Sequence, residues 1–322
     1  MTEFHVENET ASHRIVVHEG VYPVTDRSMD VSVMFDRAHI AMDSIKNDYG
    51  RHVAIYDDEM RQKILREKEI ASLMPEALAS GQIRPYLQAI VDRDGKLVGA
   101  EALVRWISPE KGVIKPTEFI RVLEDNGTVA QLDRHMWRSA CGILKQWKGA
   151  DRDDLFLSVN ISTRDFYYMD VVEELRAAVR EHDVPPSRLR VEITESAMMD
   201  DAANRFAILR ALHNDGFLVE MDDFGSGYSS LNMLKDMPVD VIKIDMLFLR
   251  EIEHQTRTAV ILRNMINMAS ELGMVPLTEG VETGEQYQML SQMGCRLFQG
   301  YLFAKPIPVD EFEAKYLSAS PA

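Results

Sequence analysis

The chain has only two cysteines among its 322 residues, Cys141 and Cys295, and both lie in apolar stretches without CxxC spacing. This pattern predicts buried free thiols in a reducing compartment rather than a disulfide framework. No run of about 18 apolar residues occurs, so no membrane-spanning helix is expected. The polar start MTEFHVENET also lacks a signal-peptide core. We therefore expect a cytoplasmic protein, or the cytoplasmic portion of a longer, membrane-tethered parent.

Basic residues are also scarce. The sequence has 36 Lys and Arg against 52 Asp and Glu, which gives a formal net charge of −16. Proteins that bind nucleic-acid polymers or anionic membranes need clustered basic side chains to displace counterions. We expect neither kind of partner. None of the nine histidines falls at the end of an expected strand and HExxH is missing, so a zinc site is not expected either.

The chain divides into three parts. Residues 1–56 contain the strand-like run HRIVVHEGVYPV, a helical pattern through FDRAHIAMDSIKNDYG and the short run RHVAIY, which together form a poor core. Residues 57–74 are charged and helical in period, with Glu59 and Lys63 four residues apart. Pro75 is expected to end this linker helix. Residues 75–318 form the third part.

Strand-like and helical stretches alternate from Ile83 onward. The expected strands are IRPYLQAIV, LVGAEALVRW, LFLSVNI, LRVEIT, FLVEM, VDVIKI, MVPLT and RLFQG. Eight strands in this length predict a (β/α)₈ barrel, which typically has about 250 residues. The alternative, an open doubly wound sheet, usually has a Gly-rich phosphate turn that is missing here. After Thr256 a helical stripe is expected to face the core, formed by Ile261, Met265, Met268 and Leu272.

Acidic and amide side chains stand at the ends of these strands, together with one lysine. They are Glu101, Asn160, Glu192, Asp222, Asp223, Lys243, Glu279 and Gln299. Because the C-terminal ends of barrel strands open on one face, we expect these side chains to converge. Carboxylate and amide oxygens suit Mg²⁺ or Mn²⁺, and so many of them favour two ions about 4 Å apart. Sites of this kind typically hydrolyse phosphate esters.

Three of these features have a simpler interpretation as well. An Asp-Asp pair is often only a turn or a helix cap, although Gly225 and Gly227 follow it here and predict a loop that closes over the site. Lys243 either extends from the barrel rim or holds the attacking water. Arg105, on the same strand face as Glu101 and Leu103, contacts either a substrate phosphate or a surface carboxylate.

Seven motifs in order resemble the bacterial EAL-domain phosphodiesterases over residues 74–308. They are ExLxR from Glu101, NIS, EITES, DDFGSGYSSL, IKID, EGVET and QGY. The resemblance implies hydrolysis of cyclic di-GMP to linear pGpG, on a barrel whose first strand runs antiparallel to the others. It also implies two divalent cations, Mg²⁺ or Mn²⁺, with Ca²⁺ inhibitory. A homodimer is expected, formed near the DDFGSGYSSL loop.

The resemblance assigns a role to each site residue. Glu101, Asn160, Glu192 and Asp222 would hold the first cation, and Asp222, Asp223 and Glu279 the second. Lys243 would contact the attacking water, Gln299 would support the water network and Glu195 would anchor the loop. Gln88, Leu103, Arg105 and Glu282 would contact substrate, and Asp245 would lie behind the ligands. This chain has Ala89 and Thr278 where the family often has proline and alanine, and neither change removes a ligand.

Two other functions stay open beside catalysis. A barrel that binds cyclic di-GMP without cleaving it would signal through a partner, and relatives of that kind typically lack a metal ligand. A purely structural barrel would leave the clustered carboxylates unexplained, because their mutual repulsion costs stability.

Residues 12–56 resemble the second half of a GGDEF diguanylate cyclase domain, through HRIVVHEGVYPV and the helix that follows. The turn that names that family is missing. We expect a partial or degenerate domain without cyclase activity.

Overall fold

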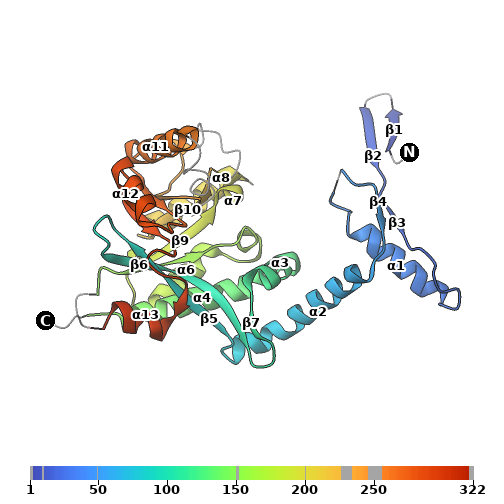
Figure 1. Cartoon of the computed structure of the whole chain (residues 1–322), viewed down its shortest axis with the longest axis horizontal. Coiled ribbons are helices and arrows are strands. Elements are labelled where there is room, and N and C mark those ends of the chain that lie inside the picture. The colour runs from blue at the N-terminus through green and yellow to red at the C-terminus, as the bar shows by residue number, and fades with distance from the viewer. Residues whose placement is uncertain are drawn as a thin grey trace. The chain divides into compact units, whose positions relative to one another are not determined.

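The computed structural model describes residues 3–8, 11–48, 50–149, 152–199, 201–225, 234–245 and 256–318. It contains two compact units, Met1–Met74 and Pro75–Ala322 (Figure 1). Within these ranges no helix is both long enough and apolar enough to span a membrane.

The first unit contains two small strand pairs and a helix. Strands β1 (Glu3–Asn8) and β2 (Ala11–Val16) pair antiparallel, whereas β3 (Glu19–Val21) and β4 (Val53–Ile55) pair parallel. Helix α1 (Val31–Asp43) connects the parallel strands and packs against them, as a parallel crossover requires. The predicted run HRIVVHEGVYPV is therefore split between β2 and β3, and β1 was not predicted.

The predicted end of the linker helix at Pro75 is wrong. Helix α2 runs from Asp58 to Ala79 and contains Pro75 in its interior. A proline there removes one backbone donor and strains the preceding turn. Met74 and Ala77, each 1% exposed, show that one face of the end of the helix is buried, and this packing offsets the loss.

The second unit is built around a closed barrel of eight strands, and each coincides with a predicted strand. They are β5 (Ile83–Val91), β6 (Leu97–Ser108), β8 (Phe156–Asn160), β9 (Leu189–Thr194), β10 (Val219–Phe224), β11 (Val241–Ile244), β12 (Val275–Thr278) and β13 (Leu297–Gln299). β5 pairs antiparallel with both β6 and β13, whereas the other pairs within the barrel are parallel. The predicted antiparallel first strand is confirmed. Short strands β7 (Gly112–Ile114) and β14 (Ile307–Pro308) extend the sheet.

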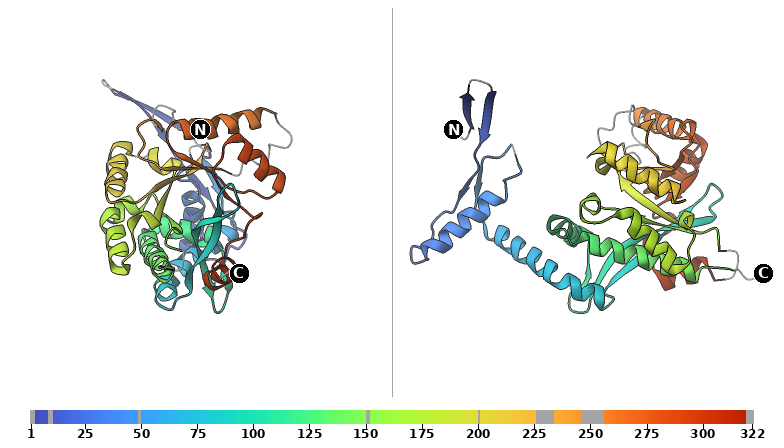
Figure 2. Two further views of the ribbon diagram at one scale, coloured as in Figure 1. Left: turned by 90° about the vertical axis from the view of Figure 1, so that its left-hand side faces the viewer. Right: turned by 180° about the vertical axis from the view of Figure 1, so that it is seen from behind.

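Helices surround the barrel (Figure 2). The longer ones are α3 (Pro116–Asn126), α4 (Val129–Gln146), α6 (Val171–His182), α8 (Ala202–Asn214), α11 (Thr256–Glu271), α12 (Gly284–Met293) and α13 (Val309–Tyr316). Short helical turns are α5 (Asp165–Tyr168), η1 (Pro186–Arg188) and α7 (Glu195–Met199). The fold is therefore the predicted α/β barrel.

The buried stripe of α11 differs from the predicted one. Leu262, Ile266 and Ala269 are at most 1% exposed, whereas Ile261 is 50% exposed and Leu272, just beyond the helix, is 43% exposed. Both stripes have helical spacing, so periodicity alone does not choose between adjacent helix faces. The choice depends on how the helix is rotated against β12, which the sequence does not state.

Apolar side chains fill the interior of the barrel towards the N-terminal ends of its strands. Ile90, Phe156, Val241 and Leu277 form one buried cluster. The two cysteines are buried and free, as predicted. Above this apolar cluster, the polar strand ends open towards the C-terminal face.

Candidate functional site

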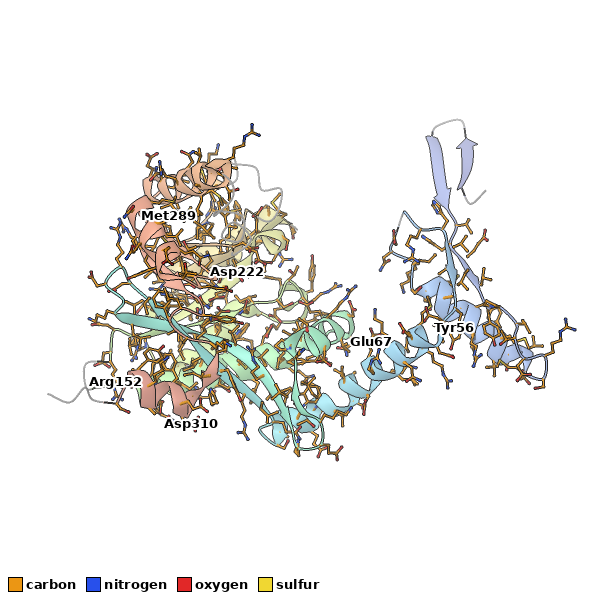
Figure 3. The ribbon with its side chains drawn as sticks, viewed as in Figure 1. Tyr56, Glu67, Arg152, Asp222, Met289 and Asp310 are labelled. Atoms are coloured by element: carbon orange, nitrogen blue, oxygen red, sulfur yellow. The ribbon has the colours of Figure 1, made fainter. Side chains whose placement is uncertain are left out.

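The side chain of Lys243 on β11 forms the centre of the site. Its Nζ lies 2.7 Å from Glu192 Oε2 and 2.7 Å from Glu279 Oε1. It also lies 3.4 Å from Glu101 Oε2 and 3.5 Å from Asp222 Oδ1. Carboxylates from β6, β9 and β10 and from the residue after β12 thus converge on one ammonium group, as the strand ends predicted. Asp222 is labelled in the barrel unit in Figure 3.

Burial and crowding shift the pKa values of this group. Burial alone would lower the pKa of Lys243, but the charges of Glu101, Glu192 and Glu279 raise it well above its usual value. Burial, and next the charge of Glu101, raises the pKa of Glu192 well above its ordinary range. Burial also raises the pKa of Glu279 to about 8, against the opposing effect of Lys243. One ammonium therefore does not neutralise the surrounding carboxylates.

Amide side chains extend the network on the other side of Glu101. Gln299 Nε2 donates to Glu101 Oε2 at 2.6 Å and to Gln88 Oε1 at 3.1 Å. Gln88 donates in turn to the backbone oxygen of Ala304 at 3.1 Å. Asn160 Nδ2 lies 3.4 Å from Glu101 Oε1. Glu101 is thus held from two sides, and the predicted residues Asn160, Gln299 and Gln88 belong to one network.

A bulge at the end of β10 brings a second carboxylate to the same face. Successive side chains of a regular strand point to opposite faces. Asp223, however, has a φ of 56°, in the left-handed region, and the register between β10 and β11 shifts between Met221 and Phe224. Burial, and next the charge of Asp222, raises the pKa of Asp223, with Asp245 contributing. Asp222 and Asp223 therefore both act on the site, with Asp245 beside them.

Gly225, which follows β10, is hydrogen-bonded to Glu195 at the start of α7. Glu195 Oε2 accepts a hydrogen bond from the Gly225 backbone N–H at 2.8 Å, and Glu195 is 2% exposed. The anchoring of the whole loop by Glu195 stays a prediction. Gly227, and with it the predicted closing loop, lies outside the described residues.

Two hollows of similar size flank the site. The first, about 370 Å³, lies against α3 and α4, and we call it the helix-side hollow; the second, about 400 Å³, is the tyrosine-side hollow. Arg105, Asn160 and Ile120 line the helix-side hollow, and Gln88, Glu279, Glu282, Gln299 and Tyr301 line the tyrosine-side hollow. Glu101, Leu103 and Asp222 line both. The predicted substrate contacts Gln88, Leu103, Arg105 and Glu282 therefore border these hollows.

The donor set fits a divalent cation. In the part of the chain that the structure describes, no three His, Cys, Asp or Glu side chains are arranged as a metal site, and the carboxylates close on Lys243 instead. Yet Glu192 Oε1 and Gln299 Oε1 are buried and accept no hydrogen bond from the described residues. Carboxylate and amide oxygens are ligands that Mg²⁺ and Mn²⁺ prefer. The uncompensated negative charge and the unpaired oxygens both favour a bound cation.

Some residues of the site do not follow from the motifs. Tyr301 is 58% exposed and lines the tyrosine-side hollow, and Asp133 of α4 lines the helix-side hollow. No periodic signal marks either one. Ser158, Arg190 and Glu220 lie inside the barrel, and each stands two residues before a predicted ligand. Strand alternation could have identified these three.

The chain is similar to known proteins over most of its length. The family model described as EAL domain matches residues 72–306. The bifunctional diguanylate cyclase/cyclic di-GMP phosphodiesterase MucR of Pseudomonas aeruginosa is 32% identical over 269 residues, which cover 83% of this chain and 39% of MucR. The cyclic di-GMP phosphodiesterase NbdA of the same organism is 33% identical over 82% of this chain and 34% of NbdA.

The barrel is also similar to a solved structure. The PaMucR phosphodiesterase in complex with c-di-GMP has a TM-score of 0.73 and 33% identity, and the match covers 76% of this chain and 99% of that one. By contrast, the chain spans less than half the length of the curated relatives named above.

Proposed function

Since the chain belongs to the EAL domain family, we propose that it hydrolyses cyclic di-GMP to linear pGpG with the help of divalent cations. The observation that carries the proposal is the pair of hollows, which meet at Glu101, Leu103 and Asp222. The network around Lys243 lies at this junction, and relatives that match most of the chain are named cyclic di-GMP phosphodiesterases.

A cyclic dinucleotide fits two hollows better than one. It has two similar nucleoside halves joined through phosphodiesters, and the hollows are similar too, at about 370 and 400 Å³. One half in each hollow brings a phosphodiester over Glu101 and Asp222. Tyr301, exposed beside the tyrosine-side hollow, offers an aromatic face on which a base can stack.

Cations are needed for this substrate because it carries two negative charges and the site is rich in carboxylates. We assign Glu101, Asn160, Glu192 and Asp222 to one cation and Asp222, Asp223 and Glu279 to the other. When bound, Mg²⁺ or Mn²⁺ lowers the pKa of water and stabilises charge on the phosphoryl oxygens.

The protein's own residues supply position and charge. Lys243, an ammonium with several donors, orients the attacking water and offsets negative charge that develops on the phosphate. Gln299 holds Glu101 through their 2.6 Å hydrogen bond. Arg105 contacts a phosphate oxygen from the helix-side hollow, Glu282 contacts substrate from the other side, and Glu195 fixes the loop through Gly225. Asp245 supports Asp223 from behind.

The first unit contains none of the proposed site residues. We propose that residues 1–56 are a partial GGDEF-like segment, that residues 57–74 link it to the barrel and that the barrel occupies residues 75–318. The parallel β3–α1–β4 crossover supports the resemblance. Without the signature turn, no synthesis of cyclic di-GMP from GTP is expected; any such product would contradict the proposal.

The proposed homodimer has its own test. A dimeric mass in light scattering supports it, and a monomeric mass at working concentration contradicts it.

The test of the main proposal is direct. The purified chain is incubated with cyclic di-GMP and Mg²⁺ or Mn²⁺, and pGpG is followed by chromatography beside a Glu101→Ala variant. Product that disappears in the variant supports the proposal. Substrate that is bound but not cleaved contradicts it and identifies a cyclic di-GMP receptor instead.

A further inference from the structure

A second polar group lies inside the barrel, beneath Glu192 and Asp222. Arg190 stands two residues before Glu192 on β9, and Glu220 two residues before Asp222 on β10. Strand alternation places these four side chains on the interior face. Arg190 Nη1 lies 2.9 Å from Glu220 Oε1, and the two side chains are 16% and 0% exposed. This is an ion pair within the barrel core.

The ion pair leaves two polar atoms unsatisfied. Arg190 Nε and Glu220 Oε2 are both buried, and neither has a hydrogen-bond partner among the described residues. A guanidinium and a carboxylate can form two parallel hydrogen bonds, but here only one is made. Leaving a buried donor or acceptor unpaired costs the free energy of removing that group from water. A small molecule that bonds both atoms would remove this cost.

A third unsatisfied atom comes from the neighbouring strand. Ser158 on β8 is the register partner of Arg190 and is 0% exposed. Its Oγ is also buried without a partner in the described part of the chain. Since neighbouring strands lie about 4.8 Å apart, the serine hydroxyl and the Arg190–Glu220 pair border the same small region.

We propose that a water molecule binds in this region. It accepts a hydrogen bond from Arg190 Nε, donates one to Glu220 Oε2 and shares a third with Ser158 Oγ. Three hydrogen bonds are typical of a buried water. A metal ion is disfavoured because the Arg190 guanidinium already balances the charge of Glu220.

A hollow lies beside the Arg190 side chain. Arg190 and Phe156 line a hollow of about 700 Å³ that borders the N-terminal ends of the strands. The Arg190 guanidinium lies over the Phe156 ring, 3.4 Å from its centroid. Arg190 thus borders this hollow and also pairs with the buried Glu220.

The proposed water and the three side chains that bind it position the proposed ligands above them, and this step rests on the proposed function. Ser158, Arg190 and Glu220 each precede a proposed ligand by two residues: Asn160, Glu192 and Asp222. The network thus ties β8, β9 and β10 together directly beneath three proposed ligands. Stability alone does not account for it, because well-packed apolar residues in place of a buried ion pair are often equally or more stable.

A crystal structure of the full chain at high resolution tests the water. The expected result is one density peak within hydrogen-bond distance of Arg190 Nε, Glu220 Oε2 and Ser158 Oγ. A direct bond between Arg190 Nε and Glu220 Oε2 would overturn the proposal, and so would a region without density. A peak surrounded by oxygens at about 2.0–2.6 Å would identify a cation and overturn it as well.

Variants of Ser158 test the positioning role. Ser158→Ala should weaken Mn²⁺ binding, measured by electron paramagnetic resonance, by about fivefold, the effect of one lost hydrogen bond. It should also lower kcat with KM unchanged. Ser158→Thr, which keeps the hydroxyl, should restore both. Ser270→Ala is the control, since the Ser270 hydroxyl donates to the Ile266 backbone oxygen within α11. Thermal unfolding shows whether each variant is folded.

The outcomes separate this inference from the proposed function. If the water is present but Ser158→Ala binds Mn²⁺ and turns over like the unaltered chain, the positioning role is overturned. If the unaltered chain binds no Mn²⁺, the positioning role and the proposed function are both overturned, while the density still decides the water. If Mn²⁺ binds but cyclic di-GMP is not cleaved, only the proposed function fails.

Discussion

Lys243 Nζ lies 2.7 Å from Glu192 Oε2, and the two side chains are 1% and 0% exposed. This buried ammonium is the counter-charge of several carboxylates and also the group to which we assign the attacking water. The same contact therefore links the stability of the barrel to its proposed chemistry.

The first prediction follows from this contact. Lys243→Met keeps the length of the side chain but removes its charge, so the buried carboxylates lose a partner at a cost of roughly 3–5 kcal/mol. Turnover should fall by about a hundredfold or more. Thermal unfolding with and without Mg²⁺ should show that the cation stabilises the variant more than the unaltered chain. Lys315→Met, on the exposed side of α13, is the control, and an equal response to Mg²⁺ in all three proteins would contradict the prediction.

Removing the cations should stop hydrolysis. Dialysis against a chelator should abolish pGpG formation, and either Mg²⁺ or Mn²⁺ should restore it. Ca²⁺ is larger and accepts looser coordination, so it should not restore activity and should inhibit when added with Mg²⁺. Brisk turnover with Ca²⁺ alone would count against the assignment of the carboxylates.

The contact between Glu195 and Gly225 should matter for turnover more than for folding. Glu195→Ala removes the acceptor of the 2.8 Å hydrogen bond from the Gly225 backbone. A misplaced loop should lower kcat on the order of tenfold to a hundredfold. Steady-state kinetics and thermal unfolding measure the two effects. Glu311→Ala, exposed on α13, should change neither, and a Glu195 variant with normal kcat would refute the anchoring role.

Stability should depend on pH through a buried carboxyl group away from the proposed ligands. Burial raises the pKa of Asp165 to about 6, although hydrogen bonds from Asp133 and from the Ser162 backbone oppose the shift. The folded state therefore binds a proton more strongly than the unfolded state does. The resulting stabilisation is fully present below about pH 4 and is lost as the pH rises through about 6.

Asp165→Asn removes this titrating carboxyl group because its amide does not titrate. Burial, and next the charge of Asp165, also raises the pKa of the neighbouring Asp133 well above its ordinary range, so the variant reports on both carboxyl groups. From pH 4 to pH 7 the free energy of unfolding of the unaltered chain should fall relative to that of the variant, by roughly 1–3 kcal/mol. Urea unfolding at several pH values measures the difference. Asp310→Asn, near the exposed start of α13, should show no such trend. A difference that is constant with pH would mean that Asp165 titrates normally.

Much of the barrel could be predicted because its pattern is local. Strand alternation and the length of each apolar run identify all eight strands, and the rule that strand ends share one face brings Glu101, Glu192 and Glu279 together. The helix stripe on α11 and the end of α2 could not be predicted in the same way. Both depend on which neighbouring surface a residue packs against, and Leu262 and Ala77 are buried by contacts that are distant in sequence.

The sequence also predicts only part of the site. The motif residues converge as expected, but the direct contacts of Lys243 with several carboxylates depend on side-chain geometry. Tyr301 and Asp133 reach the hollows because of how loops and helices cover the strand ends. Ser158, Arg190 and Glu220 were predictable in position but not in role, because the unsatisfied atoms are visible only in three dimensions.

The bulge at Asp223 has a consequence for how this chain could change over evolutionary time. A left-handed residue, with a φ of 56°, lets two consecutive carboxylates serve one face of a strand. Deleting one residue there would restore regular alternation and turn one carboxylate away, while the composition of the strand would stay nearly the same. A barrel of this kind could thereby lose a proposed ligand in a single genetic event that leaves the barrel and its two hollows intact.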